Sequence, residues 1–143
     1  MESEKRKAEE AQVISNYLSS NNIKVQPTEE GLYILSSQPG KGKKIEDGDE
    51  VSVKYTGMLL NGKIFDSTDR HGPGHETFDF TFSPEMPLIE GWILAFATMR
   101  EGDKVRLLLP SSIAYGGGQA GPDIMPYTPL IFDIEVVKVT VSN

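Results

Sequence analysis

The side chains that could do nucleophilic or acid–base chemistry are few in this 143-residue chain, and their spacing matches none of the common catalytic templates. Cysteine is absent, which excludes thiol catalysis, disulfides and cysteine-based zinc sites. No Gly-x-Ser-x-Gly nucleophile elbow occurs. Both histidines, His71 and His75, fall in one polar segment, and the Gly-Pro-Gly between them prevents a regular metal-binding helix. We therefore expect a surface loop there, and a protein without a metal or cofactor.

Charge and hydropathy exclude two further classes of function. The chain has 14 basic and 21 acidic side chains and a formal charge of −7, which argues against binding to nucleic acid. No apolar run is long enough to span a membrane, and the charged start leads into no signal-peptide core. The sequence does not fix the compartment, which would be the bacterial cell envelope (periplasm) if a signal was removed and otherwise the cytoplasm.

The remaining candidates for a site are aromatic. The chain has six Phe, five Tyr and one Trp, and the single tryptophan is Trp92. An acid follows an aromatic residue at Phe65-Asp66, and Tyr115 precedes a run of glycines. For any single ring, Trp92 included, a place in the ordinary core is the better interpretation, and Phe80, Phe82 and Phe96 are expected to be core rather than site residues. A helix packed on a concave sheet cannot fill the whole concavity, however. If a pocket is left open, aromatic and apolar residues with few polar groups would line it.

The elements that must position these rings follow from periodicity. Residues 3–22 have helical spacing, and Pro27 ends that pattern. From there on, short β-type runs alternate with Gly and Pro, and Asn61-Gly62 is a strong hairpin signal. Strands are predicted at 31–35, 51–56, 63–66, 78–82, 105–109 and 130–141, and one internal helix at 88–99. This order predicts an α+β fold, with residues 1–27 as a helical extension and 28–143 as one domain.

The N-terminal helix carries one short apolar stripe, formed by Ala11, Ile14, Tyr17 and Leu18. Four positions are few for a coiled-coil seam, so we expect the stripe to pack on the following domain and the protein to be a monomer. A dimerising arm is the alternative. The first ten residues are charged nearly all round, and we expect them to project into solvent.

Five segments together resemble the FKBP-type peptidyl-prolyl cis-trans isomerases in order and spacing. They are residues 53–59 (VKYTGML), 62–67 (GKIFDS), 88–92 (LIEGW), 110–116 (PSSIAYG) and 130–136 (LIFDIEV). The resemblance covers about residues 45–140 and implies an antiparallel half-barrel sheet wrapped around one short helix. The helical arm resembles, more weakly, the N-terminal extension of bacterial members that act in the cell envelope.

The resemblance also assigns a pocket. It implies Trp92 as the floor and Asp66 and Tyr115 as polar groups at the rim, and these three with Phe65 as the catalytic residues. The backbone N–H of Ile89 would donate to a substrate carbonyl. The substrate-binding walls would be Tyr55, Phe78, Leu88, Ile89, Ile124 and Phe132.

Two details of this implied pocket are specific to the chain. Asp66 is expected either to pair with Arg70 or to hold Tyr55 in place. The loop at residues 119–127, which overhangs the site in the family, has Met125 where members often have proline.

The activity implied by the resemblance is isomerisation of X–Pro bonds during protein folding, with proline-containing polypeptides as substrates and macrolides as inhibitors. Rotation about an amide makes and breaks no bond to carbon, which agrees with the failure of the catalytic templates. The alternative is a module or chaperone that binds proline segments with little turnover.

Overall fold

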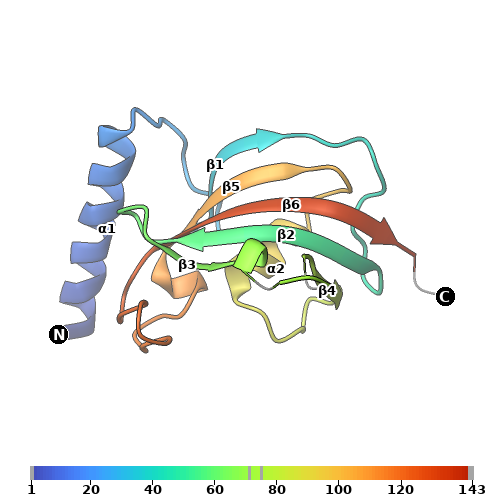
Figure 1. Cartoon of the computed structure of the whole chain (residues 1–143). Helices are drawn as coiled ribbons and strands as arrows, with labels where there is room; N and C mark the ends of the chain where they lie inside the picture. Colours follow the sequence, from blue (N-terminus) through green and yellow to red (C-terminus); the bar gives the residue numbers. More distant parts are fainter. Residues whose placement is uncertain (1, 71, 75, 142–143) are drawn as a thin grey trace.

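The fold is described from a computed structural model, which covers residues 2–70, 72–74 and 76–141 (Figure 1). His71 and His75 lie outside the described residues, so the expectations about them stay predictions. The elements in chain order are α1 (Glu2–Ser20), β1 (Tyr33–Gln38), β2 (Glu50–Met58), β3 (Ile64–Ser67), η1 (Thr68–Arg70), β4 (Phe78–Thr81), α2 (Glu90–Phe96), β5 (Lys104–Leu109), η2 (Ser111–Ile113) and β6 (Leu130–Thr140).

The strands form one antiparallel sheet in the order β1-β5-β6-β2-β3, with β4 also paired to β2. One edge of β2 is shared: its first half pairs with β4 and its second half with β3. Figure 1 shows the sheet curving over α2, with α1 standing beside one end of it. The predicted α+β fold, with a half-barrel sheet around a short helix, is confirmed.

The concave face of the sheet and α2 enclose the main core. Phe96 is fully buried, and Trp92 is 5% exposed. Gly91 allows α2 to lie close to the sheet, because a Cβ there would overlap the side chain of Leu109. This close approach brings Trp92 into the concavity rather than above it.

The opposite face of the sheet receives α1. Successive side chains of a strand point to opposite faces, so Leu107 and Leu109 pack toward α2 while Leu108 points away from it. Leu108 and Ile131 are buried under Ile14 of α1. The prediction that α1 packs its apolar stripe onto the domain is confirmed for Ile14, and Tyr17 and Leu18 are half-buried beside it. Ala11, however, is exposed, so that position of the predicted stripe was wrong.

The charged start of α1 also differs from its prediction. Glu10 is only 7% exposed, because its carboxylate accepts hydrogen bonds from Ser111.

The predicted hairpin between β2 and β3 is present, and Gly62 has the positive φ of 91° that such a turn requires. No helix among the described residues is both long and apolar enough to cross a membrane.

The internal helix is shorter than the predicted span of residues 88–99. Ile89 is extended, with φ −60° and ψ 143°, so α2 begins only at Glu90. At the other end the N–H groups of Thr98 and Met99 bond three residues back rather than four, and the Thr98 hydroxyl also donates to the Ala95 carbonyl. The helical periodicity therefore continues past α2 as tighter turns.

Candidate functional site

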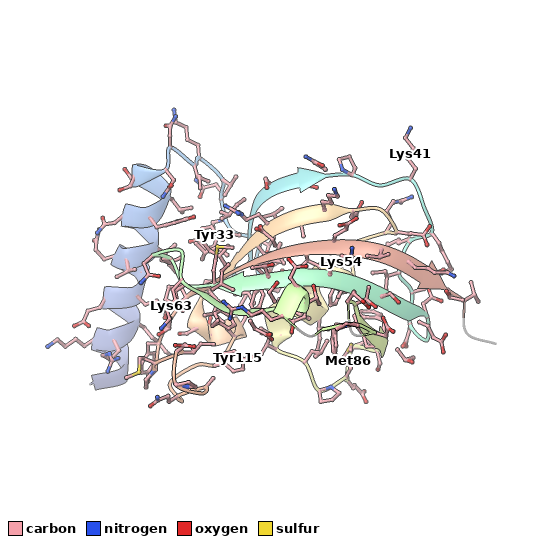
Figure 2. The ribbon with its side chains drawn as sticks, viewed as in Figure 1. Tyr33, Lys41, Lys54, Lys63, Met86 and Tyr115 are labelled. Carbon is pink, nitrogen blue, oxygen red and sulfur yellow. The ribbon has the colours of Figure 1, made fainter. Side chains whose placement is uncertain are left out.

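The concave side of the sheet contains a cavity of about 240 Å³ between β2, β3, α2 and the loop after η2. Its volume is below the roughly 300–1,000 Å³ of sites that enclose drug-sized ligands, so it suits a group the size of one side chain. In Figure 2 Tyr115 and Met86 are labelled below the strands, whereas Lys54 is labelled over the sheet, beside β6 and β2. The lining residues are Tyr55, Phe65, Asp66, Phe78, Pro87, Leu88, Ile89, Trp92, Tyr115 and Phe132.

Three rings of the cavity lining meet Trp92 edge to face, and the buried core ring of Phe96 does so as well, at 5.6 Å. The ring centroids of Tyr55 and Phe132 lie 4.9 Å and 5.2 Å from that of the indole, and that of Phe78 lies 6.1 Å away. Such arrangements are favoured by the aromatic quadrupole and leave little freedom to the indole. The indole Nε1–H is buried and has no acceptor among the residues that the structure describes. Trp92 is thus a rigid, mostly apolar surface within the cavity.

Tyr55 and Asp66 form a polar pair in the wall of the cavity. The Tyr55 hydroxyl donates to Asp66 Oδ2 at 2.5 Å. The other carboxylate oxygen accepts the backbone N–H of Ser67 at 2.8 Å. Burial, followed by the bond to Asp66, raises the pKa of Tyr55 well above its ordinary value, so the hydroxyl stays protonated. Of the two expected pairings of Asp66, the one with Tyr55 is present; the Arg70 guanidinium donates to the Ile64 carbonyl at 3.3 Å.

Tyr115 lies at the cavity's opening and is 43% exposed. Its pKa is raised by partial burial and by the negative charge of Asp66, so its hydroxyl is a donor at neutral pH. The residues on either side are anchored, because the N–H groups of Ala114 and Gly116 both donate to the Ser111 carbonyl. Tyr115 therefore projects from a fixed turn.

The segment before α2 supplies the remaining wall. Ile89 precedes the helix, and its carbonyl accepts the N–H of Trp92 at 3.0 Å. A backbone N–H at this position has no acceptor within the helix, which leaves it suited to a substrate carbonyl. Pro87 also lines the cavity, although the sequence did not single it out. Its position just before the Leu88-Ile89 segment is the sequence signal that could have identified Pro87 as a cavity residue.

The cavity brings together all the predicted site residues except Ile124. Ile124 is 5% exposed and packs in the main core, where its carbonyl accepts the N–H of Ala120. The cavity lining includes no residue from the loop at 119–127. Phe80, Phe82 and Phe96, which were expected to be core, do not line the cavity either.

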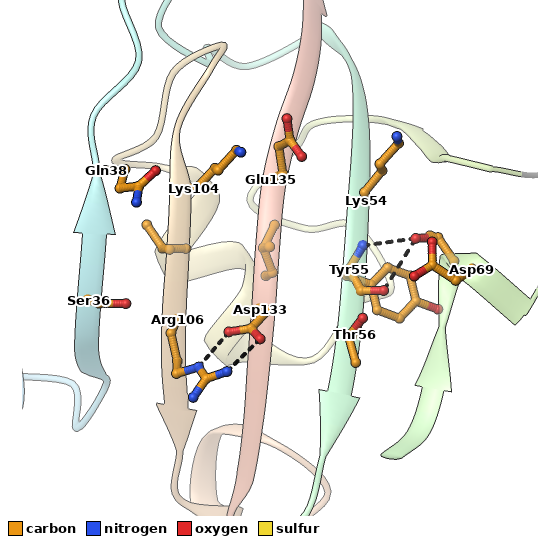
Figure 3. Close-up of a pocket in the computed structure, with 13 residues that line it drawn as sticks. Ser36, Gln38, Lys54, Tyr55, Thr56, Asp69, Lys104, Arg106, Asp133 and Glu135 are labelled. Atoms are coloured by element: carbon orange, nitrogen blue, oxygen red, sulfur yellow. Dashed lines mark hydrogen bonds and ion pairs between the residues drawn. The ribbon is translucent and has the colours of Figure 1, made fainter. Parts of the chain in front are cut away.

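A second hollow, of about 440 Å³, lies on the other face of the sheet (Figure 3). It is more open and more polar, and a bidentate pair between Arg106 and Asp133, at 2.7 and 2.8 Å, crosses it from β5 to β6. The charged side chains there neutralise one another and are open to water. It therefore lacks the enclosed apolar character of the cavity at Trp92.

No cluster of three or more His, Cys, Asp or Glu side chains suited to a metal ion occurs within the described residues.

Comparison with known proteins places the chain in a family. Residues 41–137 match the family described as FKBP-type peptidyl-prolyl cis-trans isomerase. The FK506-binding protein of Neisseria meningitidis serogroup B is 42% identical over 110 residues, which cover 76% of this chain and 96% of that protein. The FKBP-type 22 kDa peptidyl-prolyl cis-trans isomerase of Escherichia coli is 37% identical over 125 residues, which cover 86% of this chain and 58% of that protein.

Solved structures agree with this placement. The crystal structure of FkpA from Escherichia coli matches with a TM-score of 0.79 at 29% identity, over 99% of this chain and 64% of that one. A peptidyl-prolyl cis-trans isomerase from Pseudomonas syringae matches with a TM-score of 0.73 at 32% identity, over 93% of this chain and 95% of that one. The chain thus spans nearly the full length of short relatives and only part of longer ones. Fold, cavity and relatives together show that the chain belongs to the FKBP-type peptidyl-prolyl cis-trans isomerases, enzymes that rotate the peptide bond preceding proline.

Proposed function

We propose that the cavity over Trp92 is where an X–Pro peptide bond rotates, with the prolyl ring seated on the indole. The observation that carries this proposal is the combination of an enclosed aromatic cavity of about 240 Å³ with polar groups confined to its wall and opening. A prolyl ring is compact and apolar, so it suits the lining. The preceding carbonyl and the next residue would remain at the opening, near Tyr115.

The chemistry requires a lower barrier to rotation and no bond making. Amide resonance sets that barrier at about 18–20 kcal/mol, and uncatalysed exchange takes roughly tens to hundreds of seconds. The planar amide is stabilised by charge separation, which water favours, whereas the twisted transition state has less charge separation. An apolar cavity therefore prefers the twisted form. Each preference of about 1.4 kcal/mol accelerates rotation about tenfold.

The polar groups have separate roles in this proposal. The Tyr115 hydroxyl and the Ile89 N–H donate to substrate carbonyls and so orient the chain at the opening. Asp66 holds the Tyr55 hydroxyl, which fixes the Tyr55 ring against Trp92. Phe65 and Phe132 pack edge to face at 5.7 Å and close the far wall.

The substrates would be proline-containing segments of unfolded or partly folded polypeptides, because the cavity admits one side chain and is open on one side. We further propose that FK506-like macrolides compete with substrate by placing one part of the molecule, of about the size of a side chain, in the same cavity. Relatives named FK506-binding proteins support this. The contrasting function, a module or chaperone that binds proline segments with little turnover, is an outcome of the test below.

We also propose that residues 28–143 form the catalytic domain and that the protein is a monomer. The burial of Ile14 against Leu108 and Ile131 supports the second point, because the apolar stripe of α1 is already covered within the chain. Sedimentation equilibrium at micromolar concentration would test it, and a dimer mass would contradict it.

The function is tested by a coupled assay of cis–trans exchange on a proline tetrapeptide, with and without FK506. Because Trp92 is the chain's single tryptophan, its fluorescence reports independently whether ligand reaches the cavity. We expect acceleration in proportion to protein concentration, suppression by the macrolide, and a matching change in emission. A change in emission without acceleration would instead favour the binding module.

A further inference from the structure

A buried carboxylate joins α1 to the loop that carries Tyr115. Glu10 is 7% exposed and Ser111 4% exposed, although 101 residues separate them in the sequence. Glu10 Oε2 accepts the backbone N–H of Ser111, and Oε1 accepts the Ser111 hydroxyl, each at 2.6 Å. Burying a carboxylate is unfavourable unless it is hydrogen-bonded, so this paired contact fixes how α1 meets η2.

Ser111 connects the contact with Glu10 to the turn that contains Tyr115. Its carbonyl oxygen accepts the N–H of Ala114 at 2.9 Å and the N–H of Gly116 at 2.7 Å. These are the two neighbours of Tyr115 in the chain. The turn that presents the tyrosine is therefore closed on the same residue that Glu10 holds.

A second contact from α1 reaches Tyr127, which is hydrogen-bonded to this turn. Arg6 Nη2 donates to the Pro126 carbonyl at 3.3 Å, and its guanidinium lies 5.2 Å from the centroid of the Tyr127 ring. The Tyr127 N–H donates to the Gly116 carbonyl at 2.9 Å. Figure 1 shows the loops between η2 and β6 beside the N-terminal part of α1. Thus α1 contacts Ser111 and Tyr127, and both of these residues are hydrogen-bonded to Gly116.

We propose that α1 supports the opening of the cavity, and that Glu10 is a positioning residue which sets the place of Tyr115 over Trp92. Glu10 lies outside residues 41–137, the part that matches the family. The support is thus supplied by the N-terminal extension. The inference rests on the proposed function of the cavity, since it assigns Glu10 an effect on the same reaction.

The first arm of the test compares Glu10→Ala with Glu10→Gln. Alanine removes both bonds to Ser111. Glutamine keeps them, because its carbonyl accepts the N–H and its amide donates to the hydroxyl oxygen. Glu9→Ala is the matched control, since Glu9 is the exposed neighbour of the same type. For the tetrapeptide we expect kcat/KM to fall about fivefold in Glu10→Ala and less than about twofold in the other two.

The second arm asks whether the effect passes through Tyr115. In a Tyr115→Ala background, Glu10→Ala should change kcat/KM less than about twofold, because the group it positions is gone. An equal loss in both backgrounds would indicate a merely structural role and overturn the proposal, as would wild-type kcat/KM in Glu10→Ala. If Glu10→Ala fails to fold, Ser111→Ala, which removes only the hydroxyl bond, takes its place in both backgrounds.

The third arm does not depend on activity. Amide hydrogen exchange at Ala114 and Gly116 should quicken in Glu10→Ala and stay unchanged in Glu9→Ala, and unchanged exchange in both would overturn the support by α1. If the wild type fails to accelerate isomerisation while this difference in exchange is present, the proposed function is wrong and the support of the turn stands. If the wild type is active and Glu10→Ala resembles it in every arm, only the role of Glu10 is wrong.

Discussion

The hydroxyl of Tyr55 on β2 donates to the carboxylate of Asp66 on β3 at 2.5 Å, and both side chains line the cavity above Trp92. The bond links adjacent strands at the place where β2 leaves its pairing with β4 and pairs with β3. It fixes the orientation of a ring that packs on the indole at 4.9 Å. The shape of the cavity therefore depends on a polar contact within its wall.

Replacing Asp66 should disturb this wall. Asp66→Val leaves the Tyr55 hydroxyl without this acceptor, at a cost of about 1–3 kcal/mol in the free energy of unfolding. We expect kcat/KM for a proline tetrapeptide to fall at least about tenfold, as the Tyr55 ring loses its fixed orientation. The matched control is Asp69→Val, at an exposed aspartate of η1. Equal activity in the two variants would contradict the role given to Asp66.

Replacing Trp92 should remove the floor. Trp92→Ala would open a void beneath the cavity and lower the free energy of unfolding by about 3–5 kcal/mol. At a temperature where the variant is folded, the rate of isomerisation in its presence should approach the uncatalysed rate. Phe80→Leu is the control, because Phe80 packs in the core without lining the cavity. A folded Trp92→Ala protein with wild-type turnover would rule out the indole as the seat of the prolyl ring.

Gly57 should tolerate no side chain. A Cβ there would lie 2.6 Å from Phe65 Cζ and 2.7 Å from Phe132 Cε1, so both rings would have to move. Gly57→Ala should therefore lower stability by about 1–3 kcal/mol and reduce kcat/KM through the displaced wall. At Gly118 the added Cβ would meet the Tyr115 carbonyl at an ordinary 3.7 Å, so Gly118→Ala serves as control. Thermal unfolding and the peptide assay measure the two effects.

The pKa of Tyr55 predicts how stability changes in alkali. Its value is raised in the folded protein, whereas an unfolded tyrosine titrates near about 10. The contribution of the Tyr55 hydroxyl to stability is therefore complete below about pH 10 and is lost as the pH rises toward the folded pKa. The difference in unfolding free energy between wild type and Tyr55→Phe should be constant from about pH 7 to 9 and decrease above about pH 10. A decrease centred near neutral pH would contradict the shift.

Chelation should leave activity unchanged. Rotation about an amide transfers no atom and needs no Lewis acid, so prolonged dialysis against EDTA should not alter kcat/KM. Activity that disappears on dialysis and returns with one divalent ion would contradict the mechanism.

Local pattern sufficed for most of the fold. The alternation of Val51 and Val53 with polar residues predicted β2. Both valine side chains are buried, as expected for the inward-facing positions of a strand that buries one face. Asn61-Gly62 predicted the hairpin because its turn needs a positive φ, which Gly62 has. The ends of α2 were predicted less well, because the backbone of Ile89 and the tight turns at Thr98 and Met99 depend on tertiary packing.

The parts that sequence alone missed depend on distant partners. Glu10 has the local pattern of a solvated charge, and only the fold brings Ser111, 101 residues away, to its carboxylate. Ile124 belongs to a loop whose path its apolar character does not specify, and it packs in the core rather than in the cavity wall. Asp66 had two candidate partners within reach along the chain, and the pairing of β2 with β3 brought Tyr55 to it.

In the proposed function, a cavity floored by Trp92 lowers the barrier to rotation of an X–Pro bond. Exchange NMR of a proline tetrapeptide measures that rotation directly, without a coupling enzyme. Exchange between the cis and trans signals should quicken in proportion to the concentration of wild-type protein and stay close to the uncatalysed rate with folded Trp92→Ala. Exchange that stays at the uncatalysed rate with folded wild type, or that is equally fast with both proteins, would contradict the proposed function.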